Sequence, residues 1–254
     1  MKRANLGFGI ACALLPGCSF VGATAEIGLV QMTLSGDAAL ASAQGGVPPS
    51  SFQDVDGALG VGSELYSPIL RGQLDLGSLV VTGSAFVLDE SGSGTLAATF
   101  GPIAAGTPVQ TEFEFANAKL SLTYDIGLGP VKLSPGLALD VIDFRLAARE
   151  TTFGNSGQID ELLPLPMLFL RAEGDIGVVA VVGEAGYLDV PEIDGAAVRL
   201  LDLEGMVEVR VFPTLQLFAG YRLIDIDGKG ETSDTSFALD AALDGWVVGG
   251  GIRF

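Results

Sequence analysis

The feature that most constrains the fold is a series of about ten segments in which apolar residues alternate with polar or small residues. Alternation with a period of two places successive side chains on opposite faces of a β-strand, and the sequence has no helical periodicity of comparable length. Clusters of Gly, Asp, Ser and Pro separate the segments, as in chains built from strands and turns. We therefore predict strands at 26–35, 64–76, 79–89, 111–126, 130–147, 164–174, 177–188, 197–212, 214–227 and 237–254.

The connections between these strands alternate in length along the whole chain. Tight turns are expected at 77–78, 127–129, 174–176 and 212–214, and longer links at 36–63, 90–110, 150–164, 189–195 and 228–236. Transmembrane β-barrels follow this rule, because their turns are short on one side of the membrane and their loops are long on the other, whereas a β-sandwich has no reason to follow it. The pattern predicts an all-β, antiparallel, up-and-down transmembrane β-barrel of about ten strands, and about 8 to 12 strands are compatible with it.

The hydropathy of the chain agrees with lipid-facing strands. Mean hydropathy is +0.48 and 48% of the residues are hydrophobic, which is high for a water-soluble domain. Beyond the N-terminal segment no apolar run approaches the roughly 20 residues that a membrane-spanning helix needs. The alternative that remains is a soluble secreted β-sandwich or a lipocalin-like binding protein with an unusually apolar core.

The N-terminus has the pattern of an export signal. Lys2 and Arg3 precede an apolar stretch at 6–15, and Ala23 and Ala25 form the small-residue pattern of a cleavage site. We expect residues 1–25 to be a signal peptide and residues 26–254 to form a single barrel domain. The alternative is a lipoprotein signal, 1–17, with lipid attached to Cys18, although Pro16 fits that motif poorly.

Charge indicates how the interior of such a barrel is filled. Without residues 1–25, the chain keeps 11 basic and 31 acidic residues, a balance that repels nucleic acid. Charges enclosed in a narrow lumen must pair, and we expect the excess acids in loops and at strand ends. Alternation, with bulges allowed, places on the inner face Arg71, Lys119, Lys132, Arg145, Arg171, Arg210, Arg222 and Arg253 together with Asp75, Asp125, Asp140, Asp143, Glu173, Glu184, Asp202, Glu204 and Glu208.

The last strand carries a terminal aromatic residue. Trp246, Val248, Ile252 and Phe254 share one face of this strand. The sequence resembles bacterial outer-membrane β-barrel proteins in its export signal, in the alternation of short and long connections between its strands, and in its C-terminal strand. That resemblance implies residence in the outer membrane of a Gram-negative bacterium, contact with outer-membrane lipid and lipopolysaccharide, and recognition of the four residues by the barrel-insertion machinery.

Composition argues against catalysis and against a cofactor. The sequence has no histidine, and its two cysteines, Cys12 and Cys18, lie at the N-terminus. Outer-membrane phospholipases, lipid A-modifying enzymes and omptin-like proteases resemble this chain in architecture but use a catalytic histidine, so we expect no enzymatic activity. Divalent cations at the acidic loops, bridging to lipopolysaccharide, are the one ligand class that the charge suggests.

These observations predict a non-enzymatic barrel with a largely plugged, charge-paired lumen and a structural or surface-interaction role. The alternative is a narrow pore for small solutes, with space provided by the inward-facing Gly245, Gly249 and Gly251. Two features oppose a membrane barrel: aromatic residues make up only 7% of the chain, and Pro68, Pro135 and Pro166 fall in or at the ends of strands, where each removes a backbone donor.

Overall fold

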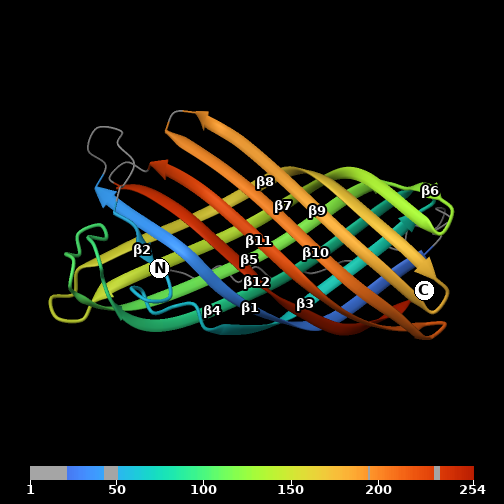
Figure 1. Cartoon of the computed structure of the whole chain (residues 1–254), viewed down its shortest axis with the longest axis horizontal. Coiled ribbons are helices and arrows are strands. Elements are labelled where there is room, and N and C mark those ends of the chain that lie inside the picture. Colours follow the sequence, from blue (N-terminus) through green and yellow to red (C-terminus); the bar gives the residue numbers. More distant parts are fainter. Residues whose placement is uncertain (1–21, 43–50, 194, 232–234) are drawn as a thin grey trace, which may run out of the picture.

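The structure, a computed structural model, describes residues 22–42, 51–193, 195–231 and 235–254. Ten long antiparallel strands in this part of the chain form a ring that closes where the last strand pairs with the first (Figure 1). Two short strands, β2 and β6, lie off the main ring. The strands are β1 (Gly22–Ser42), β2 (Gln53–Asp54), β3 (Glu64–Leu76), β4 (Leu79–Thr95), β5 (Pro108–Tyr124), β6 (Ile126–Leu128), β7 (Val131–Glu150), β8 (Ser156–Ile176), β9 (Val179–Ile193), β10 (Ala196–Phe212), β11 (Leu215–Glu231) and β12 (Thr235–Arg253).

The predicted fold class is confirmed, and each of the ten predicted strands corresponds to one strand of the ring. Several strands are longer than predicted: β8, for example, begins at Ser156 instead of 164, so the expected link at 150–164 is mostly strand. The lengths of the strands were underestimated because the outward residues change from apolar to charged along one strand. The alternation of apolar and polar residues is then lost in the sequence, although inward and outward side chains still alternate. No helix in the described part of the chain is long and apolar enough to cross a membrane.

The first strand begins upstream of the expected cleavage site. Gly22 to Ala25 already pair with β3 and β12, and the backbone groups of Ala23 and Phe254 exchange hydrogen bonds of 3.3 and 2.8 Å. A cut after Ala25 would remove this pairing, and Cys18 lies outside the described residues. Where the chain is processed stays a prediction.

The two ends of the barrel differ in their connections. The turn end holds the tight turns at 77–78, 129–130, 177–178 and 213–214, together with Gly22 and Phe254. The loop end holds residues 51–63 and 96–107, which we call the mouth segments. In outer-membrane barrels the short turns face the periplasm and the long loops face outward.

The outer wall carries an apolar belt that extends from the turn end toward the loop end. Outward side chains such as Ile27, Leu70, Leu122 and Leu168 are more than half exposed. Exposure of so large an apolar surface to water would be unfavourable, whereas lipid chains would cover this surface.

The belt ends at a ring of carboxylates, which we call the acidic ring. On nine of the ten strands the first charged outward residue above the belt is acidic. On β1 it is Asp37, and the other eight, which form the acidic ring, are Glu64, Asp89, Glu114, Asp143, Asp160, Asp189, Asp225 and Asp244.

Aromatic residues lie directly below the acidic ring. The hydroxyl of Tyr66 donates to Glu64 (2.8 Å) and that of Tyr187 to Asp189 (3.3 Å), while Tyr221 contacts Trp246 edge-on at 5.2 Å. Although aromatics are few, they gather where tyrosine and tryptophan prefer to lie, at the boundary between lipid and water.

The interior of the loop end is apolar and closed by the mouth segments. Val55, Leu59, Phe100 and Ile103 from these segments are fully buried against inward-facing residues of the barrel. Gln53 holds the two segments together, because its Oε1 accepts hydrogen bonds from the backbone N–H groups of residues 97 and 98 at 2.8 and 3.2 Å.

The three prolines mark interruptions of the β-ladder. Pairing between β3 and β4 covers Ile69 to Leu76 and stops next to Pro68, and Pro135 lies in the gap between the β5–β7 and β6–β7 ladders. Pro166 lies in the part of β8 that does not pair with β9. A proline cannot donate to a ladder, so these residues are compatible with the barrel because pairing stops where they occur.

The closing strand requires small residues where it meets β1. A Cβ added to Gly249 would lie 2.6 Å from the Cα of Gly28 and 2.6 Å from Cζ of Phe218. We expect Gly249→Ala to lower the free energy of unfolding by about 1–3 kcal/mol because it forces the backbones apart, measured by urea unfolding of the barrel in lipid vesicles. Gly205→Ala is the matched control, since its Cβ meets no atom within 4 Å; equal losses for the two variants would contradict the prediction.

Candidate functional site

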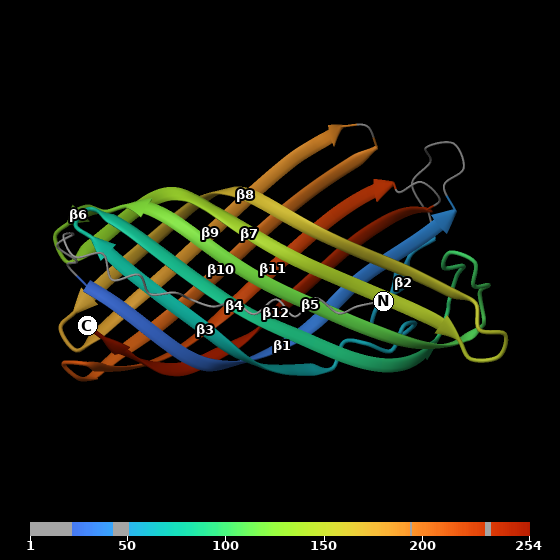
Figure 2. The same cartoon turned by 180° about the vertical axis from the view of Figure 1, so that it is seen from behind.

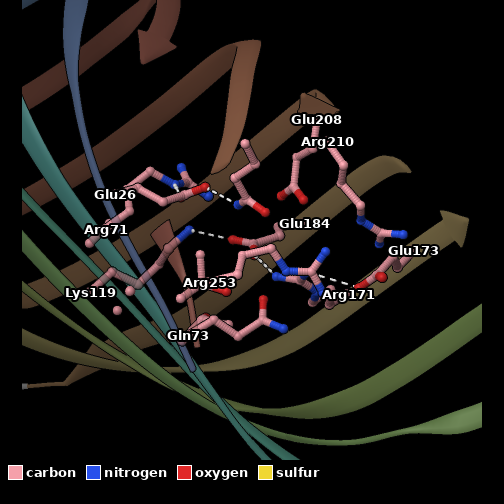
Figure 3. A pocket seen from close by; sticks show the side chains of 16 residues that line it. Glu26, Arg71, Gln73, Lys119, Arg171, Glu173, Glu184, Glu208, Arg210 and Arg253 are labelled. Atoms are coloured by element: carbon pink, nitrogen blue, oxygen red, sulfur yellow. Dashed lines mark hydrogen bonds and ion pairs between the residues drawn. The ribbon is translucent and has the colours of Figure 1, made fainter. Parts of the chain in front are cut away.

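Charged and amide side chains fill the turn-end half of the interior (Figure 3). They come from eight different strands of the ring, and because inward positions alternate along each strand, they converge on the barrel axis. We call this set the lumen cluster: Glu26, Arg71, Asn117, Lys119, Asp140, Arg171, Glu173, Glu184, Asp202, Glu204, Gln216 and Arg222.

Arg222 is the centre of the lumen cluster and is fully buried. Its guanidinium binds Asp202 through two contacts, Nε to Oδ1 at 3.0 Å and Nη2 to Oδ2 at 2.9 Å. Nη2 also donates to Oδ1 of Asn117 at 3.1 Å, and the amide of Asn117 donates to Asp140 at 2.5 Å. The planar face of the guanidinium lies 5.4 Å from the ring centre of Phe86. This arrangement gives the buried arginine a paired charge, three hydrogen bonds and an aromatic packing partner, while its Nη1 donates to no atom of the described residues.

Lys119 connects this centre to a second group of charges. Its Nζ lies 2.9 Å from Asp202 and 3.3 Å from Glu184. The other oxygen of Glu184 accepts from Arg171 at 3.1 Å, and Arg171 also reaches Glu173 at 3.0 Å. The ion pairs therefore continue without a break from the centre of the barrel toward the turn end.

Arg71 forms a third group on the other side of the lumen. Its guanidinium pairs with Glu204 and with Glu26, the latter at 3.2 Å, and Gln216 donates to Glu26 at 2.6 Å. The guanidinium also lies 5.6 Å from the ring centre of Phe218. Glu26, Asn117 and Gln216 were not among the predicted lumen residues, although the alternation around each of them places it on the inner face.

At the turn end the contacts loosen. Lys132 lies 3.9 Å from both Asp125 and Glu173, and Gln73 donates to Asp75 at 2.8 Å. These groups are partly exposed, so each ion pair contributes little to stability.

Arg210 pairs with Asp175 at 2.7 Å and donates to the carbonyl of Gly177 at 2.9 Å. Its neighbour on the strand, Glu208, is not its partner. Glu208 and Arg253 line a small pocket between the charged side chains, which Figure 3 shows, and among the described residues neither forms an ion pair within 4 Å.

Two predicted lumen residues lie on the outer face instead. Asp143 is exposed, and Arg145 pairs with Glu114 on the outside of the barrel at 3.7 Å. Their assignment to the inner face is wrong because it required a bulge in the strand, whereas β7 pairs with both neighbours in one uninterrupted register around these residues.

The space left between the charged side chains is small. The pocket shown in Figure 3 has a volume of about 40 Å³, and one water needs about 10–15 Å³ measured in this way. The inward glycines of β12 do not enlarge it, because Phe218 occupies the space beside Gly28 and Gly249. The pocket has room for a few water molecules.

The described residues contain no group of three or more acidic side chains arranged to hold a metal ion. Within the lumen cluster the acids Glu184, Asp202 and Glu204 each contact a lysine or an arginine.

Comparison with solved structures gives a match over the whole ring. The outer membrane protease OmpT from Escherichia coli has a TM-score of 0.56 and 11% sequence identity, with 94% of this chain and 99% of that chain covered. The fold is that of a bacterial outer-membrane β-barrel protein. Together with its lipid-facing belt, this fold places the barrel in the outer membrane of a Gram-negative bacterium.

Weaker likenesses are found to Neisserial surface protein A (14% identity, 91% and 97% of the two chains, TM-score 0.39) and to Ail of Yersinia pestis (10% identity, 92% and 98%, TM-score 0.38). No protein-family model matches the sequence, and no relative was found among curated proteins.

The C-terminal residues face the membrane in this barrel. Trp246 and Phe254 are 59% and 78% exposed, and Val248 and Ile252 lie between them on the same outer face. The inward positions between and beside them are Gly245, the fully buried Val247, Gly249, Gly251 and Arg253.

Proposed function

We propose that the protein is a non-enzymatic barrel with a closed interior and a structural or surface-interaction role in the outer membrane. The observation that carries this proposal is the lumen cluster, in which fully buried ion pairs run across the barrel from β11 to β8. Such a network fills the cross-section with side chains that cannot move apart without leaving charges unpaired.

The loop end supports the same proposal independently. The mouth segments fold into the barrel and bury apolar side chains there, so a second closure lies above the charged one. Solute passage would require both to open.

Absence of catalysis is supported by composition and by the state of the acids. The chain has no histidine, and the buried acids of the lumen cluster are engaged by cations or by Asn117.

The surface partner that fits the outer wall is lipopolysaccharide. The acidic ring lies at the edge of the belt, where lipid headgroups lie, and divalent cations would bridge its carboxylates to lipid phosphates. Insertion into the membrane would depend on the exposed residues of the last strand, Trp246, Val248, Ile252 and Phe254.

The proposal predicts no steady conductance when the folded barrel is inserted into a planar lipid bilayer. Folding of the same sample is checked by the change in gel mobility on boiling, which a barrel shows and a soluble protein does not. Long-lived single-channel openings by folded protein would contradict the closed interior and favour the narrow pore.

A further inference from the structure

One seam of the barrel is open toward the loop end. β8 and β9 pair only from Leu168 and Tyr187 down to the turn. Above these residues, β8 pairs with β7 alone and β9 pairs with β10 alone. In Figures 1 and 2 the tip of the β9–β10 hairpin lies well apart from the start of β8.

Prolines occupy the edges that face each other across this seam. The N–H of Asp175 donates toward β7, so in the regular pleat the odd residues of β8 bond to β7 and the even residues face β9. Pro164 and Pro166 are even, and each lacks a donor toward β9.

The same holds on the opposite edge. The carbonyl of Val178 accepts a hydrogen bond from β10, so even residues of β9 bond to β10 and odd residues face β8. Pro191 is odd, and continuing the register would place it opposite Pro164. Three donors are therefore missing where this ladder would continue.

Behind the seam lies an apolar cavity inside the barrel. It has a volume of about 50 Å³, and its lining is mostly apolar, with Ile159 and Leu163 of β8 and Val198, Ile226 and Phe237 from the facing strands. Glu161 and Lys229 also line it. Space of this size holds three or four groups of the size of a water molecule, which corresponds to the tip of a hydrocarbon chain. Leu188 of β9 is only partly buried beside the same core.

The seam opens at the level of the outer leaflet. Leu162 and Leu168, on the outward face of β8, are 64% and 69% exposed and belong to the lipid-facing belt. The acidic ring crosses the seam at Asp160 and Asp189. Below the ring the seam faces lipid hydrocarbon, not water. The cavity lies level with the ring and toward the loop end, because Ile159 and Phe237 are on the loop side of Asp160 and Asp244 in their own strands, so a chain that enters below the ring turns toward the loop end to reach it.

We propose that the cavity behind the β8–β9 seam binds one hydrocarbon chain of an outer-leaflet lipid, which enters sideways from the membrane between the two unpaired edges. A cavity of about 50 Å³ is too small for a lipid headgroup, and most of its lining is apolar, so the headgroup remains at the acidic ring while the chain end enters the barrel. This site is separate from the lumen cluster and does not depend on whether the lumen conducts.

Fluorescence quenching by a lipid brominated on its acyl chain tests the proposal directly, because bromine quenches tryptophan only at close range. Trp246 is the single native tryptophan, so the reporter is Phe237→Trp in a Trp246→Phe background. We expect this reporter to lose fluorescence when brominated lipid replaces ordinary lipid in the vesicles. Phe218→Trp in the same background is the matched interior control, far from the seam, and is expected to be unaffected; equal responses at the two positions would overturn the proposal.

The route is tested by restoring the missing donors. Pro164→Val, Pro166→Val and Pro191→Val together allow the two edges to pair, and quenching of the reporter at 237 should then fall to that of the control. Should the triple variant not fold, Pro166→Val alone is measured and a partial fall is expected. Unchanged quenching in the folded variant would rule out entry at this seam.

Two further measurements identify the seam through which the chain enters and the molecule that supplies the chain. Pro68→Val restores a donor at the β3–β4 interruption and should leave quenching at 237 unchanged; a fall there would assign entry to that seam and overturn ours. A brominated free fatty acid added to ordinary vesicles is the second arm. Quenching by the free acid but not by the brominated lipid would overturn a membrane lipid as the occupant.

Discussion

Replacing Arg222 with Met is expected to lower the free energy of unfolding by about 3–5 kcal/mol, because it leaves Asp202 charged and buried with only part of its compensation. Both side chains are completely inaccessible to solvent, and Arg222 supplies two of the contacts to this carboxylate. Lys119 remains at 2.9 Å, so the barrel should still fold. Urea unfolding in lipid vesicles measures the change.

Arg199→Met is the control variant for this prediction, because it removes an arginine from an exposed ion pair. Arg199 pairs with Asp227 at 3.2 Å, but both side chains are more than half exposed on the outer wall, and such pairs contribute about 0–1 kcal/mol. Adding Asp202→Asn to Arg222→Met should recover part of the loss, since it removes the uncompensated charge. Similar losses for the Arg222 and Arg199 variants would mean that the buried centre does not hold the barrel together.

Replacing Phe218 with Ala is expected to cost about 3–5 kcal/mol, as for other buried phenylalanines. The ring is 4% exposed, fills the space beside Gly28 and Gly249, and lies against the Arg71 guanidinium. Its removal leaves a void that glycines cannot fill and loosens the arginine that pairs with Glu204. The same urea titration measures the loss.

Phe153→Ala serves as the control for this variant, because Phe153 is 83% exposed in the β7–β8 turn. A small loss for Phe218→Ala, close to that of the control, would show that the inner glycines leave real space and would strengthen the narrow pore. Conductance of the same variant in a planar bilayer reports whether that space connects the two ends.

The architecture could be predicted from the sequence because it depends on a period of two and on turn lengths. Both signals are local, and they gave all ten strands of the ring and the charged inner face of β10, including Asp202 and Glu204. What failed depends on register. Asp143 and Arg145 were placed inside by a bulge that β7 does not have, and no local pattern distinguishes a bulge from an uninterrupted strand.

Partners within the lumen could not be predicted for a different reason. Lys119 and Glu184 are 65 residues apart, and Arg71 and Glu204 are 133 apart. Which inward charges meet depends on the tilt of the strands around the ring, because tilt decides which residues share a height on the axis. The mouth segments were likewise expected to be links, and their buried Leu59 and Phe100 are single apolar residues in sequence rich in Gly and Ala.

The acidic ring also fixes how deep the protein sits. A downward shift of two residues along the strands would draw carboxylates such as Asp89, Asp143 and Asp160 into hydrocarbon at the same time, and a charge buried there is costly. An upward shift would lift leucines such as Leu29 and Leu162 out of the lipid. Both displacements act on many strands at once, so the depth of the barrel in the membrane is fixed within a narrow range. A membrane of different thickness would deform around the barrel before the protein changed its depth.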